Sequence, residues 1–166
     1  MHSKQHKKTN GFLLVDKPAG ITSFDVIRKL KPMLNGEKIG HSGTLDPFAT
    51  GLMILAIGKS FTPRLNDLIT LNKSYSAQIT LGISTDTYDC DGVPSTPAMV
   101  PSFSDQNLTT IIHKFKGKIT QTPPIYSAKK INGTPAYKLA RKNKPIIMTP
   151  VDVEIYELDI LNIALP

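Results

Sequence analysis

A loop rich in small residues runs directly into the most apolar stretch of the chain, and this junction constrains the fold more than any other feature. Residues 40–51 read GHSGTLDPFATG, and residues 52–58, LMILAIG, follow without a break. A short apolar run bounded by turn residues predicts a buried strand. Glycine permits backbone angles that other residues avoid and lets a ligand approach the main chain closely. The sequence therefore predicts a loop of defined conformation, held by a buried strand.

Asp46 is the candidate reactive residue of this loop. Pro47 fixes its own φ angle and disfavours helical backbone at the residue before it. A carboxylate held rigidly at the edge of a cleft can act as a nucleophile or as a general base. The residues alone leave one alternative open, in which Asp46 is a turn or helix-capping residue, since Asp before Pro is common in turns.

Alternating apolar residues predict further strands. Strands are expected at residues 11–15 and 73–82, and a short one before the two prolines at 123–124. A last strand is expected over residues 151–161, with a bulge at Tyr156 because the alternation slips there. Asn132-Gly133 is typical of a tight hairpin turn.

Capping residues and apolar spacing predict short helices. One should begin after Thr22 or Ser23, one after Ser104, and others are expected over residues 59–70 and 135–143. Roughly five or six strands and four helices, without strict βαβ alternation, predict an α+β fold with a mixed, mainly antiparallel sheet flanked by helices.

The charge balance favours a polyanionic partner. The 166 residues include 20 basic and 13 acidic side chains, for a formal net charge of +7. Such a balance is typical of proteins that bind nucleic acid or an anionic membrane surface, although a generally basic soluble protein is the alternative. We expect residues 1–10 to form a basic disordered tail and residues 11–166 to form a single domain.

Cysteine and hydropathy patterns exclude other classes of protein. The single cysteine argues against a disulfide framework, and the four histidines are scattered, without the spacing of a zinc site. No apolar run reaches the roughly 18–20 residues that span a membrane, and the first apolar stretch is too short for a signal peptide. We expect a cytoplasmic monomer with no metal and no membrane association.

Residues 89–93, DCDGV, resemble two unrelated motifs, but the surrounding sequence fits neither of them. The nucleophile motif of haloacid-dehalogenase-type phosphatases requires its first aspartate at the end of a buried strand, whereas the residues before Asp89 are polar. A calcium-binding EF-hand loop fails because Ala98 stands where the bidentate glutamate belongs.

Four blocks of the chain together resemble one known family. The blocks are GFLLVDKPAGITSFDVI, KIGHSGTLDPFATGLMILAIGKSFT, KSYSAQITLGISTDTYDCDG and TQTPPIYSAKKINGTPAYKLAR. In order and spacing they resemble the TruB family of tRNA pseudouridine synthases, and they cover nearly the whole chain. The resemblance implies a pseudouridine-synthase-like catalytic domain that isomerises uridine to pseudouridine at position 55 of the tRNA T-loop. It also implies the tRNA T-arm as partner and no cofactor.

The resemblance also implies roles for individual residues. Asp46 matches the catalytic aspartate, which attacks the target uridine; the glycosidic bond then breaks, the base rotates, and carbon 5 rejoins the ribose. Tyr75 matches a tyrosine that stacks on the flipped uracil, and His41 matches a histidine that helps hold the RNA in its flipped state. Lys17 and Pro18 match a Lys-Pro motif that supports the catalytic loop. A core aromatic and a hydrogen-bonded loop histidine are the alternatives for Tyr75 and His41.

The later part of the chain supplies candidate RNA contacts. Its basic residues fit phosphate binding, with Lys129 and Lys130 as the candidates, and a solvated helix face is the alternative. Asp89 is predicted to help orient the catalytic arginine that the family carries.

That arginine, which pairs with the catalytic aspartate, belongs to a further family motif, GTYIR or close to it. The motif does not occur in this chain. The family's C-terminal RNA-binding extension is not found either. We therefore expect a C-terminally truncated sequence with an incomplete sheet. The alternative function is a non-catalytic tRNA-binding or folding module.

Overall fold

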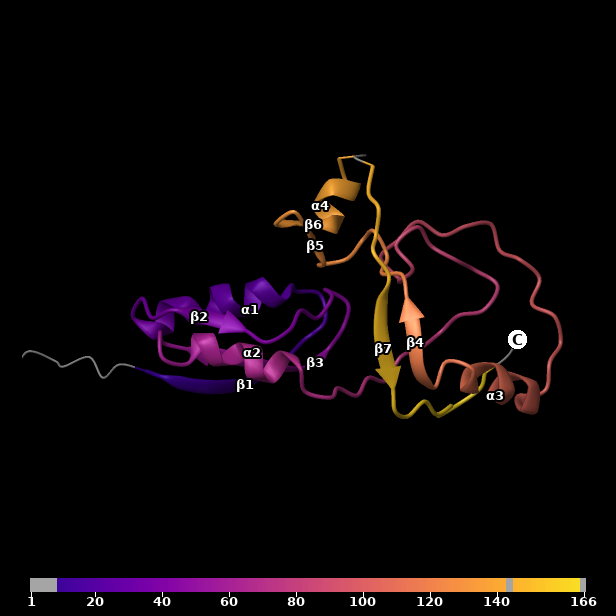
Figure 1. Cartoon of the computed structure of the whole chain (residues 1–166), viewed down its shortest axis with the longest axis horizontal. Coiled ribbons are helices and arrows are strands. Elements are labelled where there is room, and N and C mark those ends of the chain that lie inside the picture. Colours follow the sequence, from indigo (N-terminus) through magenta and orange to yellow (C-terminus); the bar gives the residue numbers. More distant parts are fainter. Residues whose placement is uncertain (1–8, 143–144, 165–166) are drawn as a thin grey trace, which may run out of the picture. The chain divides into compact units, whose positions relative to one another are not determined.

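The computed structural model describes residues 9–142 and 145–164, which belong to two compact units that adjoin between Ala77 and Gln78. The first unit contains a three-stranded antiparallel sheet in the order β1-β3-β2 (Figure 1). Its strands are β1 (Gly11–Lys17), β2 (Ile39–His41) and β3 (Gly51–Ile57). The central strand β3 contains the apolar run that the sequence singles out, and Leu55 at its middle is fully buried.

Helix α1 (Ser23–Leu30) packs its apolar side against one face of this sheet. Val26 and Ile27 are buried together with Met53 and Leu55 of β3, and they form the core of the unit. Burying each such side chain contributes about 1.5–3 kcal/mol. A 3₁₀ turn, Lys31–Leu34, extends the helix, and the chain then reverses at Asn35 and Gly36, both of which have positive φ.

A capping box starts α1. The Thr22 side chain accepts a hydrogen bond from the Asp25 amide, and the Asp25 carboxylate accepts from the Thr22 amide and hydroxyl. These bonds from Thr22, with a smaller contribution from Arg28, lower the pKa of Asp25. Because the folded pKa lies below the unfolded one, this stabilisation is present at neutral pH. It is lost as the pH falls through the folded value.

A second 3₁₀ turn, Thr62–Arg64, and helix α2 (Leu65–Ile69) complete the secondary structure of the first unit. The guanidinium of Arg64 lies over the rings of Phe12 and Phe61, at 5.3 and 5.5 Å from their centroids. Those two rings also meet edge to face. This cluster fastens the turn to β1.

The second unit is built from short elements. Strands β4 (Gly117–Gln121) and β7 (Val151–Ile155) pair antiparallel, with Ile119 opposite Val153 (Figure 1). Helix α3 (Asp105–His113) begins at a capping box formed by Ser104 and Asn107. Strands β5 (Lys130–Ile131) and β6 (Thr134–Pro135) form a hairpin that leads into helix α4 (Ala136–Ala140).

The predicted α+β class with antiparallel pairing is confirmed. The strands at residues 11–15 and 52–58, the helices after Ser104 and over residues 59–70, and the hairpin turn at Asn132-Gly133 are all present. Of the two residues predicted to cap α1, Thr22 is the cap. Residues 1–8 of the predicted tail lie outside the described residues, and the prediction of one domain over residues 11–166 stays a prediction.

Two strand predictions are wrong. The predicted strand at residues 73–82 does not form, and residues 73–80 are exposed, although Tyr75, Ala77 and Ile79 alternate as in a strand. Alternation alone does not make a strand, because the backbone groups need a neighbouring strand to pair with. The last strand ends at Ile155 instead of Leu161, so the slip at Tyr156 marks the end of a strand and no bulge. In addition, β2 is not predicted by the sequence, since two of its three residues, 40 and 41, fall in the predicted loop over residues 40–51.

None of the helices in the described part of the chain is long and apolar enough to cross a membrane.

The capping box gives a test of the first unit. Replacing Thr22 with alanine removes the acceptor for the Asp25 amide and is expected to cost about 1 kcal/mol in the stability of α1. Amide hydrogen exchange of α1, read by NMR, measures this change. Ser104→Ala removes the equivalent cap from α3 and is the matched control, which should leave α1 unchanged. Equal protection of α1 in the Thr22→Ala and parent chains would contradict the assignment.

Candidate functional site

Asp46 lies at an exposed position of the loop between β2 and β3. Backbone hydrogen bonds hold this loop from within the unit. The Ser42 amide donates to the Ile54 carbonyl at 3.0 Å, and the Ala49 amide donates to the Asp46 carbonyl at 3.1 Å. The second bond closes a turn over residues 46–49, which fixes the peptide that follows Asp46. The carboxylate therefore projects from backbone of defined shape.

The buried ammonium of Lys17 ties this loop to the turn that follows β1. Lys17 is 0% exposed, which is rare for lysine. Its Nζ donates to the carbonyls of Pro18, Ile21 and Pro47, at 3.0, 2.8 and 3.2 Å. A buried ammonium needs such partners, because each N–H group left without one costs free energy. Lys17 thus joins the Lys-Pro segment to the residue after Asp46.

Gly20 adds a second bond to the same carbonyl. Its amide donates to the Pro47 carbonyl at 2.8 Å, from a backbone with a φ of 82°. Residues with a side chain seldom adopt this angle, so glycine suits the position. The side chain of Pro18 is exposed at the start of the turn.

Ser23 is a contact that sequence reasoning did not assign to the loop. Its side chain is buried, and its hydroxyl donates to the Leu45 carbonyl at 3.0 Å and accepts from the Leu45 amide at 2.9 Å. The pair Thr22-Ser23 was the signal in the sequence. A helix needs only one of two adjacent hydroxyl residues as its cap, so the other hydroxyl is available for a different contact.

His41 ends β2, at the start of the loop. Its Nδ1 lies 2.6 Å from the Gly43 carbonyl oxygen. A carbonyl oxygen only accepts hydrogen bonds, so Nδ1 carries the proton of this bond. In the neutral ring, Nε2 then bears the lone pair and can accept a hydrogen bond from a ligand.

Tyr75 follows α2 in the same unit. Its side chain is 74% exposed and lies in the extended segment that forms no strand. The ring therefore makes little contact with the rest of the chain. This arrangement does not fit the alternative in which Tyr75 is a core aromatic.

The remaining predicted residues belong to the second unit. Asp89 organises its own loop, because its Oδ1 accepts from the Thr87 hydroxyl at 2.7 Å and from the Asp91 amide at 3.0 Å. Lys129 donates from Nζ to the Thr149 carbonyl at 3.1 Å, and Lys130 is exposed on β5. Lys129 thus connects the start of the hairpin to the segment before β7.

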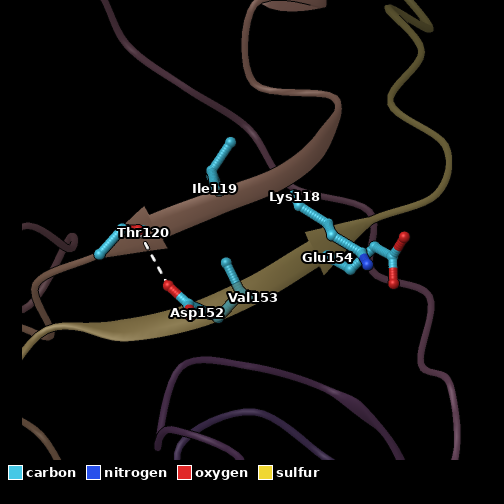
Figure 2. A pocket seen from close by; sticks show the side chains of 6 residues that line it. All are labelled: Lys118, Ile119, Thr120, Asp152, Val153 and Glu154. Carbon is cyan, nitrogen blue, oxygen red and sulfur yellow. Dashed lines mark hydrogen bonds between the residues drawn. The ribbon is translucent and has the colours of Figure 1, made fainter.

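A pocket also lies on the β4–β7 pair, and Figure 2 shows its six lining residues. Thr120 donates to Asp152 across the two strands at 2.9 Å. None of the predicted site residues lines this pocket. The Asp46 loop is the stronger candidate, because its carboxylate is exposed while its backbone is held by buried groups. Within residues 9–142 and 145–164, no cluster of three or more His, Cys, Asp or Glu side chains is placed to hold a metal ion.

The chain is similar to proteins named tRNA pseudouridine synthase B. The protein from Opitutus terrae is 44% identical over 160 residues, which cover 96% of this chain and 66% of that protein. The protein from Chlamydia abortus is 41% identical, with coverage of 93% and 68%. The protein from Aquifex aeolicus is 42% identical, with coverage of 92% and 53%. The chain thus spans about half to two thirds of the length of these relatives.

A solved structure shares the fold. In the crystal structure of a Cbf5-Nop10-Gar1 complex, a chain matches with a TM-score of 0.57 and 22% identity, covering 95% of this chain and 36% of that one.

A family model described as TruB family pseudouridylate synthase (N terminal domain) matches residues 31–166. This match includes the loop of Asp46 and more than half of the chain. The chain belongs to the TruB family of pseudouridylate synthases.

Proposed function

We propose that the protein containing this chain converts uridine to pseudouridine at position 55 in the T-loop of tRNA, with Asp46 as the catalytic aspartate. The observation that carries the proposal is the construction of the Asp46 loop. An exposed carboxylate lies between residues whose backbone is bonded to buried Lys17 and buried Ser23. Membership of the family and the names of its relatives supply the reaction and the substrate class.

The reaction is an isomerisation, so it needs no second substrate. Asp46 attacks the target uridine, the bond between N1 and the ribose breaks, and the base rotates within the site. Carbon 5 then bonds to the ribose and loses its hydrogen as a proton, while N1 gains a proton. The bond that Asp46 formed breaks, which releases its carboxylate. A rigidly held nucleophile suits this sequence, because the freed base has to stay in register with the sugar.

The target base has to leave its stack before it can react. Extrusion costs a few kcal/mol, and stacking on an aromatic ring recovers roughly 1–3 kcal/mol. The exposed ring of Tyr75 suits this role, and Nε2 of His41 can accept a hydrogen bond from the RNA. The net positive charge of the chain supports binding to the phosphate backbone, for which Lys129 and Lys130 remain the proposed contacts. A tRNA substrate also fits a cytoplasmic location.

Replacing Asp46 with asparagine tests the chemistry. The substitution keeps the side-chain size but removes the nucleophile, so turnover should fall by about a thousand-fold or more. Binding of a T-arm stem-loop should change little. Turnover is read as tritium released from RNA labelled at carbon 5 of uridine, because that carbon loses its hydrogen. Asp67→Asn, at an exposed position of α2, is the matched control and should stay active.

The assay should compare this chain with the chain extended by the C-terminal segment of a longer relative. Product that persists in Asp46→Asn would contradict the proposal. RNA binding without product from either length would favour the non-catalytic tRNA-binding module.

Replacing Tyr75 tests the stacking role. Tyr75→Leu removes the aromatic ring and should lower kcat/KM about ten-fold or more, whereas Tyr75→Phe keeps the ring and should stay within about three-fold. Tyr156→Leu changes another exposed tyrosine, in the second unit, and serves as the control. If Tyr75→Phe were as damaging as Tyr75→Leu, the hydroxyl would be the important group and stacking would be the wrong explanation.

A further inference from the structure

Ser23 bonds to both backbone groups of a single loop residue. Its hydroxyl accepts from the Leu45 amide at 2.9 Å and donates to the Leu45 carbonyl at 3.0 Å. The side chain is only 3% exposed, so water does not readily replace these bonds. A serine hydroxyl carries one proton and two lone pairs, and this arrangement uses the proton and one lone pair on the same residue.

The Leu45 carbonyl belongs to the planar peptide unit that joins Leu45 to Asp46. By binding that oxygen, Ser23 fixes the orientation of the peptide that precedes the Asp46 Cα. The peptide that follows Asp46 is fixed separately, since the Asp46 carbonyl accepts from the Ala49 amide at 3.1 Å. With both flanking peptides held, the two backbone angles of Asp46 are set, and with them the direction in which its carboxylate leaves the main chain.

The adjacent hydroxyls of Thr22 and Ser23 have different roles, since one caps α1 and the other bonds to the loop. Thr22 caps α1 through its bonds with Asp25, so the helix does not depend on the Ser23 hydroxyl for its start. The Ser23 side chain turns to the loop instead, and its partner lies 22 residues away in the sequence. The Ser23 hydroxyl is therefore buried, has no role in capping the helix, and bonds to the residue before Asp46.

We propose that Ser23 is a positioning residue, which orients Asp46 for catalysis by holding the peptide between Leu45 and Asp46. We call the two hydrogen bonds between Ser23 and Leu45 the clamp. Its effect on catalysis rests on the proposed function, whereas the clamp itself is a property of the fold. Loss of the clamp lets the carboxylate swing away from the reacting atoms, and displacements of about 1 Å can lower rates about a hundred-fold.

Ser23→Ala and Thr22→Ala form a matched pair of tests. Each removes one hydroxyl at the start of α1, and only the first touches Leu45. In Ser23→Ala, kcat on the T-arm stem-loop should fall about ten-fold or more while KM stays within about three-fold, because alignment changes and binding does not. Thr22→Ala should keep its kcat, measured at a temperature where both variants are folded.

Two NMR readouts need no catalysis. In Ser23→Ala the Leu45 amide should lose protection from hydrogen exchange about ten-fold or more, and the ¹³C shift of the Asp46 carboxylate should move. Thr22→Ala should leave that shift unchanged and should lower Leu45 protection by no more than about five-fold, which is the most that a cost of about 1 kcal/mol to α1 produces. Ser23→Cys replaces the hydroxyl with a somewhat larger thiol that forms weaker hydrogen bonds, and it is measured in the same way if the alanine variant does not fold.

Unchanged Leu45 protection in Ser23→Ala would overturn the clamp. Equal kcat in the two alanine variants would overturn its catalytic role, even with a changed Leu45 amide. A parent protein that makes no pseudouridine would instead count against the proposed function, and the NMR readouts would still confirm or overturn the clamp.

Discussion

The buried ammonium of Lys17 is the interaction on which the organisation of the candidate site depends. It lies at the end of β1 and binds the carbonyls of the turn before α1 and of Pro47 in the loop of Asp46. A charge with no exposed surface is stable in a protein only where fixed dipoles replace water. The three carbonyls are such dipoles, so strand end, turn and loop have to assemble together around one group.

The rest of the site follows from this assembly. Gly20 supplies the positive φ that brings the turn against Pro47, and α1 then begins where Ser23 reaches Leu45. Asp46 is therefore held from both sides while its own side chain stays exposed. A reactive carboxylate benefits from this combination, because catalysis requires fixed geometry at the attacking atom and access for the substrate. The core of β3 and α1 gives the assembly a rigid base.

Local signals in the sequence predicted the parts of the fold that have local causes. The apolar run of β3, the caps of α1 and α3, and the turn at Asn132-Gly133 each depend on a few neighbouring residues. The strand predicted at the segment of Tyr75 is wrong for the opposite reason. A strand needs a neighbouring strand to pair with, and the residues of the segment do not specify one. The burial of Lys17 was not predictable either, because lysine is seldom buried and its carbonyl partners are spread over 30 residues. The family resemblance predicts that Lys17 supports the loop, whereas the link from Ser23 to Leu45 is apparent only in the folded chain.

The most direct test is the stability of the first unit when Lys17 is replaced by methionine, which keeps much of the side-chain length and removes the ammonium. Amide hydrogen exchange along β3 measures the free energy of opening, with Lys29→Met on the exposed side of α1 as the control. Loss of the charge-assisted bonds should lower that free energy by about 2 kcal/mol, whereas Lys29→Met should change it by less than about 0.5 kcal/mol. Equal protection of β3 in the two variants would contradict the account, because the site would then assemble without the ammonium.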